Sequence, residues 1–178
     1  MARRFRSPAG KLGGVCLLAS LLAGCGLTQT VSEGTVAVTK AIFFKQIKVL
    51  RLDFTPRAAL NTDGDQAPLT TMVRVYQLKD RKAFDGADYQ QLLRQDEVIL
   101  KNDLLAQQAV LVMPDGSVSL DMPMENDTQF VAVVGLFRVP DHQKGDWRIV
   151  LRRSDLDPDK PRTLELGDGA LTLLPLRD

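Results

Sequence analysis

The residue with the most distinctive chemistry is Cys25, a thiol at the end of an apolar run. It follows Leu22, Ala23 and Gly24. Small residues at these positions suit the pocket of a signal peptidase, and the thiol can form a thioether with a diacylglycerol. The four residues make a lipobox, which predicts cleavage between Gly24 and Cys25 and a covalent lipid on Cys25.

The segment before Cys25 has the pattern of an export signal. Its first eleven residues carry Arg3, Arg4, Arg6 and Lys11 and no acidic residue, and residues 12–22 are apolar apart from two glycines and one serine. This run is too short to cross the roughly 30 Å of a bilayer core, which argues against a membrane helix. An ordinary secretory signal is the other alternative. We expect residues 1–24 to be removed.

The residues after the lipobox indicate where the mature chain resides. Each buried acyl methylene contributes about 0.8 kcal/mol, so two or more chains hold a protein stably on its membrane. Gly26 stands where an aspartate would resemble the retention signal of inner-membrane lipoproteins. We therefore expect an outer-membrane anchor, with a flexible tether over residues 25–40 and a single domain over residues 41–178 that faces the periplasm.

Charge and cysteine content exclude several classes of protein. Removal of residues 1–24 takes away four positive charges and no negative ones, so the net charge falls from +1 to −3. This balance gives no reason to expect nucleic-acid binding. Cys16 leaves with the signal and Cys25 is acylated, so the mature domain has no free thiol and no disulfide.

Candidate catalytic and metal-ligating residues are few. His142 is the only histidine and sits in a polar turn, without the partners that a zinc site or a catalytic triad needs. The acidic run at residues 155–159 begins like a calcium loop, but Lys160 and Leu166 occupy positions where an EF-hand has Gly and Glu. We predict no enzyme, no metal and no cofactor apart from the lipid on Cys25.

Trp147 and Arg148 could form a sugar-stacking or cation-binding pair. However, Trp147 alternates with Ile149 and Leu151, which is the pattern of a strand with one buried face. We expect Trp147 to belong to the core and Arg148 to lie on the solvated side of that strand.

The hydrophobic pattern of the mature chain predicts short strands with a helical interruption. A period of two begins near Ile47 and returns at residues 71–78, 109–113, 118–124, 147–151, 162–166 and 170–174, and residues 130–139 are apolar on both faces. Between the second and third strands, about residues 81–105, the period changes. Asp85 could cap a first helix with Tyr89, Leu92 and Leu93 buried, and a second could run over residues 96–100 with Val98 and Ile99 inward. The fold class is mainly β, a two-sheet β-sandwich with a short helical insertion.

The segment between the first two strands is rich in residues that favour turns. Such segments lie on the surface and can offer backbone groups and carboxylates to a partner. From the residues alone it could equally be a plain connector. Its central residues are Asn61, Thr62, Asp63, Gly64, Asp65, Gln66, Ala67 and Pro68.

Several segments together resemble the TssJ family, the outer-membrane lipoproteins of type VI secretion systems. Besides the lipobox, they are Val-Arg-Val-Tyr-Gln-Leu at 73–78, Phe-Asp-Gly-Ala-Asp-Tyr at 84–89, Pro-Asp-Gly at 114–116, Val-Val-Gly-Leu-Phe-Arg at 133–138 and Trp-Arg at 147–148. They occur in the family's order across most of the mature chain, whereas residues after Ser154 match no motif.

The resemblance implies a transthyretin-like sandwich with extra helices and a structural role. In that role the domain binds the periplasmic C-terminal part of the inner-membrane protein TssM, and through it other subunits of the type VI membrane complex. It also implies that the loop between the first two strands, residues 61–68 here, carries much of the contact. The alternatives are a periplasmic small-ligand or carbohydrate-binding β-sandwich lipoprotein and an envelope hydrolase.

Overall fold

The computed structural model describes residues 46–176. The predicted signal segment 1–24, the tether 25–40 and the lipidation site Cys25 with Gly24 lie outside these residues. Along the described chain the elements are β1 (Val49–Pro56), β2 (Thr71–Leu78), α2 (Lys82–Gly86), α3 (Tyr89–Leu100), β3 (Leu104–Val112), β4 (Val118–Pro123), β5 (Phe130–Leu136), β6 (Arg148–Arg152), the 3-10 turn η1 (Arg153–Asp155), β7 (Arg162–Leu166) and β8 (Leu171–Leu173).

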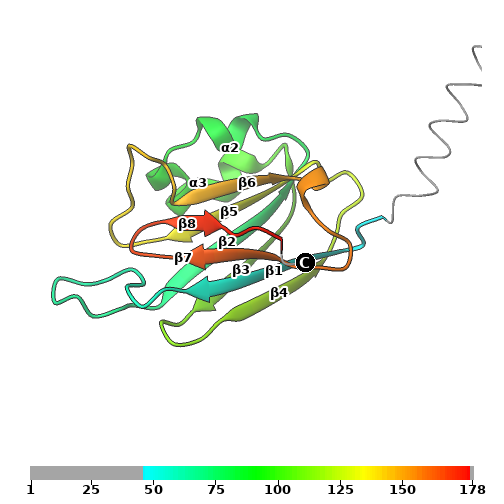
Figure 1. Ribbon diagram of the computed structural model, residues 1–178. Helices are drawn as coiled ribbons and strands as arrows, with labels where there is room; N and C mark the ends of the chain where they lie inside the picture. Colours follow the sequence, from blue (N-terminus) through cyan, green and yellow to red (C-terminus); the bar gives the residue numbers. More distant parts are fainter. Residues whose placement is uncertain (1–45, 177–178) are drawn as a thin grey trace, which may run out of the picture. The chain divides into compact units, whose positions relative to one another are not determined.

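The strands of residues 46–176 form two four-stranded sheets that pack face to face (Figure 1). The first sheet has the order β4-β1-β7-β8 and the second has the order β3-β2-β5-β6. The buried apolar side chains of both sheets make one core between them. The prediction of a mainly β, two-sheet sandwich with a helical insertion between strands is confirmed.

Strand β1 lies inside the first sheet and runs from one end of the sandwich to the other. It pairs antiparallel with β4 and parallel with β7. Its alternate residues Leu50, Leu52 and Phe54 are buried in the core, as the period of two predicts. Because both of its edges are paired, β1 is held along its whole length.

Strands β2 and β5 form the centre of the second sheet and are covered on both faces. Val73 and Val75 of β2 face the core, whereas Tyr76 points to the other side and packs against Phe84 of α2, with ring centroids 6.2 Å apart. All of these side chains are fully buried. Coverage on both faces explains why residues 130–136 are apolar on both sides, as expected of a central strand.

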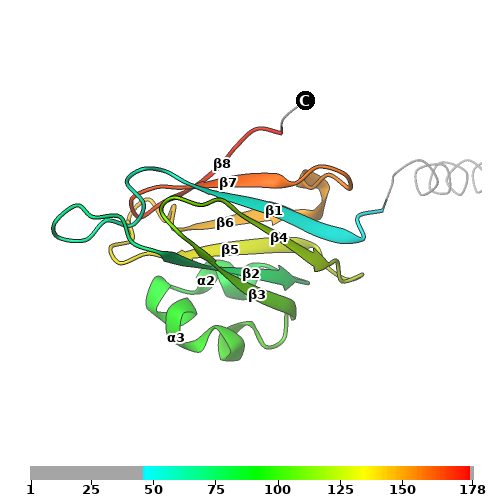
Figure 2. The same ribbon diagram turned by 90° about the horizontal axis from the view of Figure 1, so that it is seen from below.

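Helices α2 and α3 cover the outer face of the second sheet (Figure 2). The prediction that Asp85 caps a helix was wrong, because Asp85 lies inside α2 and the cap of α3 is Asp88. The Asp88 carboxylate accepts from the Gln91 amide at 2.8 Å, and the Gln91 side chain accepts from the Asp88 amide at 2.9 Å. This capping box starts α3 after the chain has turned to an extended conformation at Ala87.

Helix α3 bends at Gln95, whose φ of −139° is not helical. The short second helix predicted over residues 96–100 is therefore the second half of α3. Tyr89 and Leu92 are buried as expected and Leu93 is half-buried. Val98 was expected to face inward and is instead 75% exposed.

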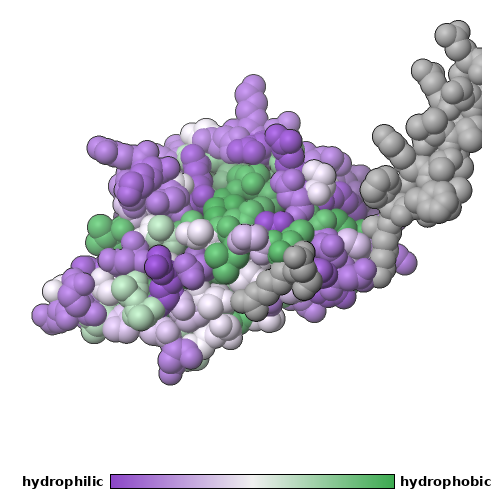
Figure 3. All heavy atoms as spheres, in the orientation of Figure 1, coloured by the Kyte–Doolittle hydropathy of each residue, from purple (hydrophilic) through white to green (hydrophobic). Residues whose placement is uncertain are grey.

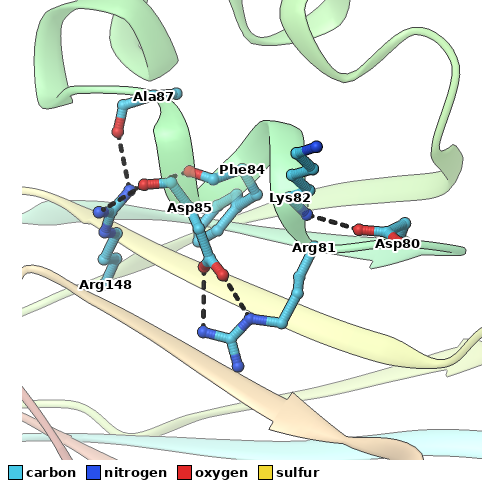
Figure 4. Close-up of polar contacts among 7 residues, drawn as sticks. All are labelled: Asp80, Arg81, Lys82, Phe84, Asp85, Ala87 and Arg148. Carbon is cyan, nitrogen blue, oxygen red and sulfur yellow. Dashed lines mark hydrogen bonds and ion pairs between the residues drawn. The ribbon is translucent and has the colours of Figure 1, made fainter.

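Arg148 was expected on the solvated side of its strand, but it is half-buried and attaches α2 to the sheet (Figure 4). Its guanidinium donates to the carbonyl oxygens of Phe84 at 2.9 Å, Ala87 at 2.8 Å and Asp85 at 3.2 Å. These carbonyls lie at the end of a very short helix, where the regular helical donors run out. The Phe84 carbonyl also accepts from the Ala87 amide at 3.2 Å. The neighbouring Trp147 is 3% exposed, so its assignment to the core is confirmed.

The connections between strands gather at two opposite ends of the sandwich (Figure 1). The loop end carries residues 57–70, 113–117, 137–147 and 167–170. The N-terminal end carries residue 46, where the described chain begins, and the connections 124–129 and 153–161. Since β1 starts at one end and finishes at the other, it separates the start of the described chain from residues 57–70.

Candidate functional site

Residues 57–70, the β1–β2 loop, extend beyond the ends of the strands further than the neighbouring connections (Figure 1). In the same orientation, Figure 3 shows the projecting part as mainly hydrophilic. Gly64, Asp65, Gln66, Ala67 and Pro68 are all exposed. These residues form the tip of the loop, and they can be reached by another molecule.

Asn61 and Thr62, at the base of this loop, are buried, contrary to the sequence-based expectation that they lie on the surface. Asn61 and Thr62 are 6% and 8% exposed. The Asn61 side-chain oxygen accepts from the Arg138 amide at 2.7 Å, in the β5–β6 connection. The Thr62 amide and hydroxyl both donate to one carboxylate oxygen of Asp168, at 2.9 and 3.0 Å, in the β7–β8 turn. Asn61 and Thr62 therefore anchor the loop.

Further bonds fix the same base from both sides. The Arg57 amide donates to the Leu166 carbonyl at 2.7 Å, and the Arg138 guanidinium donates to the Thr62 carbonyl at 3.3 Å. Asn61 has a φ of +47°, in the left-handed region that asparagine tolerates better than most residues. The base is thus held by two other connections that are distant in sequence.

The tip has an internal order that centres on Asp63. One oxygen of its carboxylate accepts from the amides of Asp65 and Ala67, both at 2.9 Å. Its own amide donates to the Ala67 carbonyl at 3.0 Å, and the Gln66 amide donates to the Asp63 carbonyl at 3.2 Å. Gln66 is held at a φ of +63°, which is uncommon for a residue other than glycine. The tip is therefore a hydrogen-bonded turn rather than an extended segment.

This arrangement suits binding more than bond-breaking chemistry. The tip offers the Asp65 carboxylate, the Gln66 amide and several backbone groups to solvent, on a support that is already ordered. A loop that is ordered before binding loses less conformational entropy when a partner orders it further. The sequence indicated the exposed tip through its turn residues, but it gave no signal for the buried anchors Asp168 and Arg138.

The other residues considered for chemistry are placed as structural or solvated groups. His142 is exposed in the β5–β6 connection, and its ring is nearly perpendicular to that of Tyr89, with the ring centroids 5.8 Å apart. The carboxylate of its neighbour Asp141 accepts hydrogen bonds from the backbone amides of Lys144 and Gln143, and these bonds lower the pKa of the Asp141 carboxyl. Within residues 46–176 no three acidic, histidine or cysteine side chains converge as a metal site would need.

A polar cluster that the sequence did not indicate lies between β2 and α3. The Arg74 guanidinium pairs with Asp96 at 3.0 Å and donates to the carbonyls of Leu92 and Leu93, next to the bend in α3. The Tyr76 hydroxyl donates to the same Asp96 carboxylate at 2.8 Å. Burial, and then the bond to Asp96, raise the pKa of Tyr76 well above its usual range.

A hollow of about 260 Å³ adjoins this cluster. It is lined by charged and amide side chains, whereas a typical small-ligand pocket is mostly apolar. Its lining residues are Arg74, Tyr76, Asp96, Glu97, Gln107, Gln108 and Ala109. The hollow therefore gives little support to the small-ligand alternative.

The sandwich and its ordered projecting loop define a binding domain. The family model described as "Type VI secretion lipoprotein, VasD, EvfM, TssJ, VC_A0113" matches residues 48–169. The chain belongs to this family of type VI secretion lipoproteins, which are structural components of that system. Among curated proteins no sequence matches it.

Solved structures agree with this assignment. A chain of a structure described as "Type VI membrane complex" is 48% identical, with a TM-score of 0.70, and the match covers 73% of this chain and 100% of that one. A chain of "T6SS protein TssM C-terminal domain (869-1107) from EAEC" is 45% identical, with a TM-score of 0.67 and coverage of 72% and 99%. The lipoprotein TssJ1 from Pseudomonas aeruginosa, at 23% identity, has the same fold, with a TM-score of 0.62 and coverage of 75% and 98%.

Proposed function

We propose that this chain is an outer-membrane lipoprotein that binds the periplasmic C-terminal part of TssM through its β1–β2 loop and so helps to build the type VI secretion membrane complex. The observation that carries the proposal is the ordered loop, which projects from the end of the sandwich opposite the start of the described chain. A partner that arrives from the inner membrane meets this end first if the other end is tethered to the outer membrane.

The names of the similar structures support the choice of partner. Two structures that exceed 40% identity to this chain are described as a TssM C-terminal domain and as a type VI membrane complex. Both match nearly the whole length of the neighbouring chain. Chains this similar commonly keep the same fold and the same mode of association, so TssM is the partner to test first.

The anchor in this proposal is the lipid on Cys25. The lipobox supports it. Cys25→Ser should leave the domain folded and release it from the membrane fraction. Mass spectrometry of the mature protein should show acyl chains on Cys25, and an unmodified amino terminus at that residue would contradict the anchor.

We also propose that the protein has no catalytic role. Among residues 46–176 no three acidic, histidine or cysteine side chains converge, and His142 is an exposed residue whose ring packs against that of Tyr89. Turnover of an envelope substrate that is lost on His142→Ala would contradict this part of the proposal.

The loop is tested by a charge reversal at its tip. Asp65 is exposed and its side chain makes no contact that shapes the loop, so Asp65→Lys should preserve the fold. We expect the full, lipidated chain in mild detergent to bind the periplasmic part of TssM at least tenfold more weakly after this change. Asp127→Lys is the matched control, because Asp127 is an exposed turn aspartate at the N-terminal end. Equal affinity of the two variants would remove the loop tip from the interface.

A further inference from the structure

The exposed apolar side chains of the described residues are concentrated at one end of the molecule. Six large hydrophobic side chains are exposed between residues 46 and 176. Four of them, Met72, Leu111, Met113 and Val139, belong to the loop end, beside the β1–β2 loop. The other two are Val98 in α3 and Leu176 beyond β8.

Three of the four form a continuous patch on the outer face of the second sheet. Met72 and Leu111 are direct partners across the β2–β3 pair, so their side chains stand next to each other on one face. That face is opposite the core, because the adjacent residues Val73 and Val112 are fully buried. Met113 continues the alternation from Leu111, and half-buried Leu136 is the partner of Met72 on its other side.

Strand β3 contributes no charged side chain to this strand-end patch. From Leu104 to Met113 the chain has no charged residue, although β3 is an edge strand. Edge strands that stay solvated usually carry charged side chains that prevent association. The next residue of this face on β2 is Arg74. Its guanidinium donates hydrogen bonds to the Asp96 carboxylate and to the Leu92 carbonyl of α3. An uncharged apolar patch at an open edge indicates an interaction site.

The β1–β2 loop alone is too small for a stable interface. Its exposed tip has five residues, whereas a standard interface uses about 20 to 30 residues on each side. The strand-end patch is continuous with the loop in the chain, because β2 begins at Thr71 directly after it and Met72 is the next residue. A partner seated on the loop tip therefore has this apolar surface within reach.

We infer that Met72, Leu111 and Met113 form the second half of the partner interface, with an apolar surface of the same TssM segment packed against them. This inference rests on the proposed function and assigns different roles in binding to the loop tip and to the strand-end patch. The polar tip sets the orientation of the partner, and the strand-end patch supplies apolar area that is removed from water. Methionine suits this role because its flexible side chain adapts to the shape of a partner.

A second copy of this chain fits the patch less well. An antiparallel pairing of β3 with β3 of another copy would place the N-terminal ends of the two sandwiches on opposite sides, since β3 runs from the N-terminal end to the loop end. Two lipid tethers in one membrane would then have to reach around their own domains. The patch is better matched to a partner that approaches the loop end.

The test compares exposed apolar residues inside and outside the strand-end patch. Leu111→Glu and Met113→Glu alter side chains that are 56% and 59% exposed, and Val98→Glu, at 75%, is the matched control on α3. The full lipidated chain in mild detergent is assayed for binding to the periplasmic part of TssM, and its melting temperature is measured in parallel. We expect at least a tenfold loss of affinity for the first two variants, none for Val98→Glu, and unchanged melting temperatures.

The outcomes separate the two proposals. If Asp65→Lys weakens binding while Leu111→Glu and Met113→Glu behave like Val98→Glu, the strand-end patch is not part of the interface and the proposed function stands. If the unaltered chain does not bind TssM, both proposals fail. Sedimentation of the unaltered chain as a dimer that Leu111→Glu dissociates would assign the patch to self-association and overturn the inference.

Discussion

Thr62 and Asp168 are 106 positions apart in sequence and share two hydrogen bonds, from the Thr62 amide at 2.9 Å and from its hydroxyl at 3.0 Å. Both bonds end on the same carboxylate oxygen. The pair joins the β1–β2 loop to the β7–β8 turn, so the projecting loop is fixed by the far end of the chain.

Removing this carboxylate should loosen the loop without touching its exposed tip. Asp168→Ala is expected to cost about 1 kcal/mol of unfolding free energy, because the Thr62 amide loses its acceptor. Hydrogen exchange at the Thr62 amide should accelerate, and TssM should bind several-fold more weakly. Asp168→Asn keeps an acceptor oxygen and should restore most of both properties. If Asp168→Ala leaves exchange at Thr62 unchanged, the loop is held by its other contacts alone.

Two glycines at the loop end should respond very differently to the addition of one methyl group. Gly169 has a φ of +83°, and a Cβ there would lie 2.6 Å from the Val139 carbonyl oxygen. We expect Gly169→Ala to destabilise the domain by about 2 kcal/mol or more, through backbone strain and overpacking. Gly64 lies at the loop tip, where a Cβ would have no neighbouring atom within 4 Å, so Gly64→Ala should be nearly neutral. Denaturant unfolding of both variants checks this, and similar midpoints would contradict it.

Removal of the two arginine side chains that contact α2 should also destabilise the domain to very different extents (Figure 4). Arg148→Ala removes one donor from the Phe84 carbonyl, which keeps the Ala87 amide, and the guanidinium donor of the Ala87 carbonyl. It also removes a guanidinium 4.8 Å from the Trp147 ring centroid. We expect a loss of about 2 kcal/mol. Arg81 makes an exposed pair with Asp85 one helical turn away, and Arg81→Ala should cost at most about 0.5 kcal/mol. Equal losses in urea unfolding would show that Arg148 does not secure the helix.

Stability should fall at high pH because of Tyr76. Burial and the bond to Asp96 raise the pKa of its hydroxyl, so the folded state favours the neutral form. This contribution is fully present below the ordinary tyrosine pKa of about 10 and is lost as the pH rises through that value towards the raised pKa of the folded state. Tyr76→Phe should therefore flatten the decrease in unfolding free energy between pH 9 and about pH 11. An unchanged decrease would assign it to other groups.

The period of two predicted much of the sandwich because the pattern is local. Residues 71–78 and 162–166 are strands as expected, and the apolar run at residue 130 onward is a central strand. Pairing partners were not predictable in the same way. Strand β7 lies beside β1 in a parallel arrangement that depends on contacts more than 100 residues apart.

Most of the short motifs within residues 46–176 that resemble the TssJ family belong to the core of the fold rather than to the candidate site, whereas Pro-Asp-Gly at 114–116 is a turn at the loop end. The Tyr89 hydroxyl donates to the Phe137 carbonyl at 2.6 Å, and the ring centroids of Tyr89 and Trp147 lie 5.0 Å apart. Arg148 donates to the Phe84 carbonyl of α2. These segments converge on one cluster that attaches the helices to the second sheet. The loop tip is exposed and lacks such a cluster, so only its turn-forming residues indicated it.

The loop anchors escaped prediction for a related reason. Asn61 and Thr62 are polar residues in a polar segment, and such residues are usually exposed. Their burial depends on Arg138 and Asp168, which the fold brings to the same end. The sequence pattern does not distinguish a polar turn residue that is exposed to water from one that is buried against a distant hydrogen-bond partner.

The proposed function requires the loop end to bind the inner-membrane partner. Hydrogen–deuterium exchange of the full lipidated chain in detergent, with and without the periplasmic part of TssM, maps the bound surface. We expect slower exchange in peptides that cover residues 57–72 and 111–115, with no change at residues 124–129 and 153–161 of the N-terminal end. Slower exchange at the N-terminal end, with residues 57–72 unaffected, would contradict it.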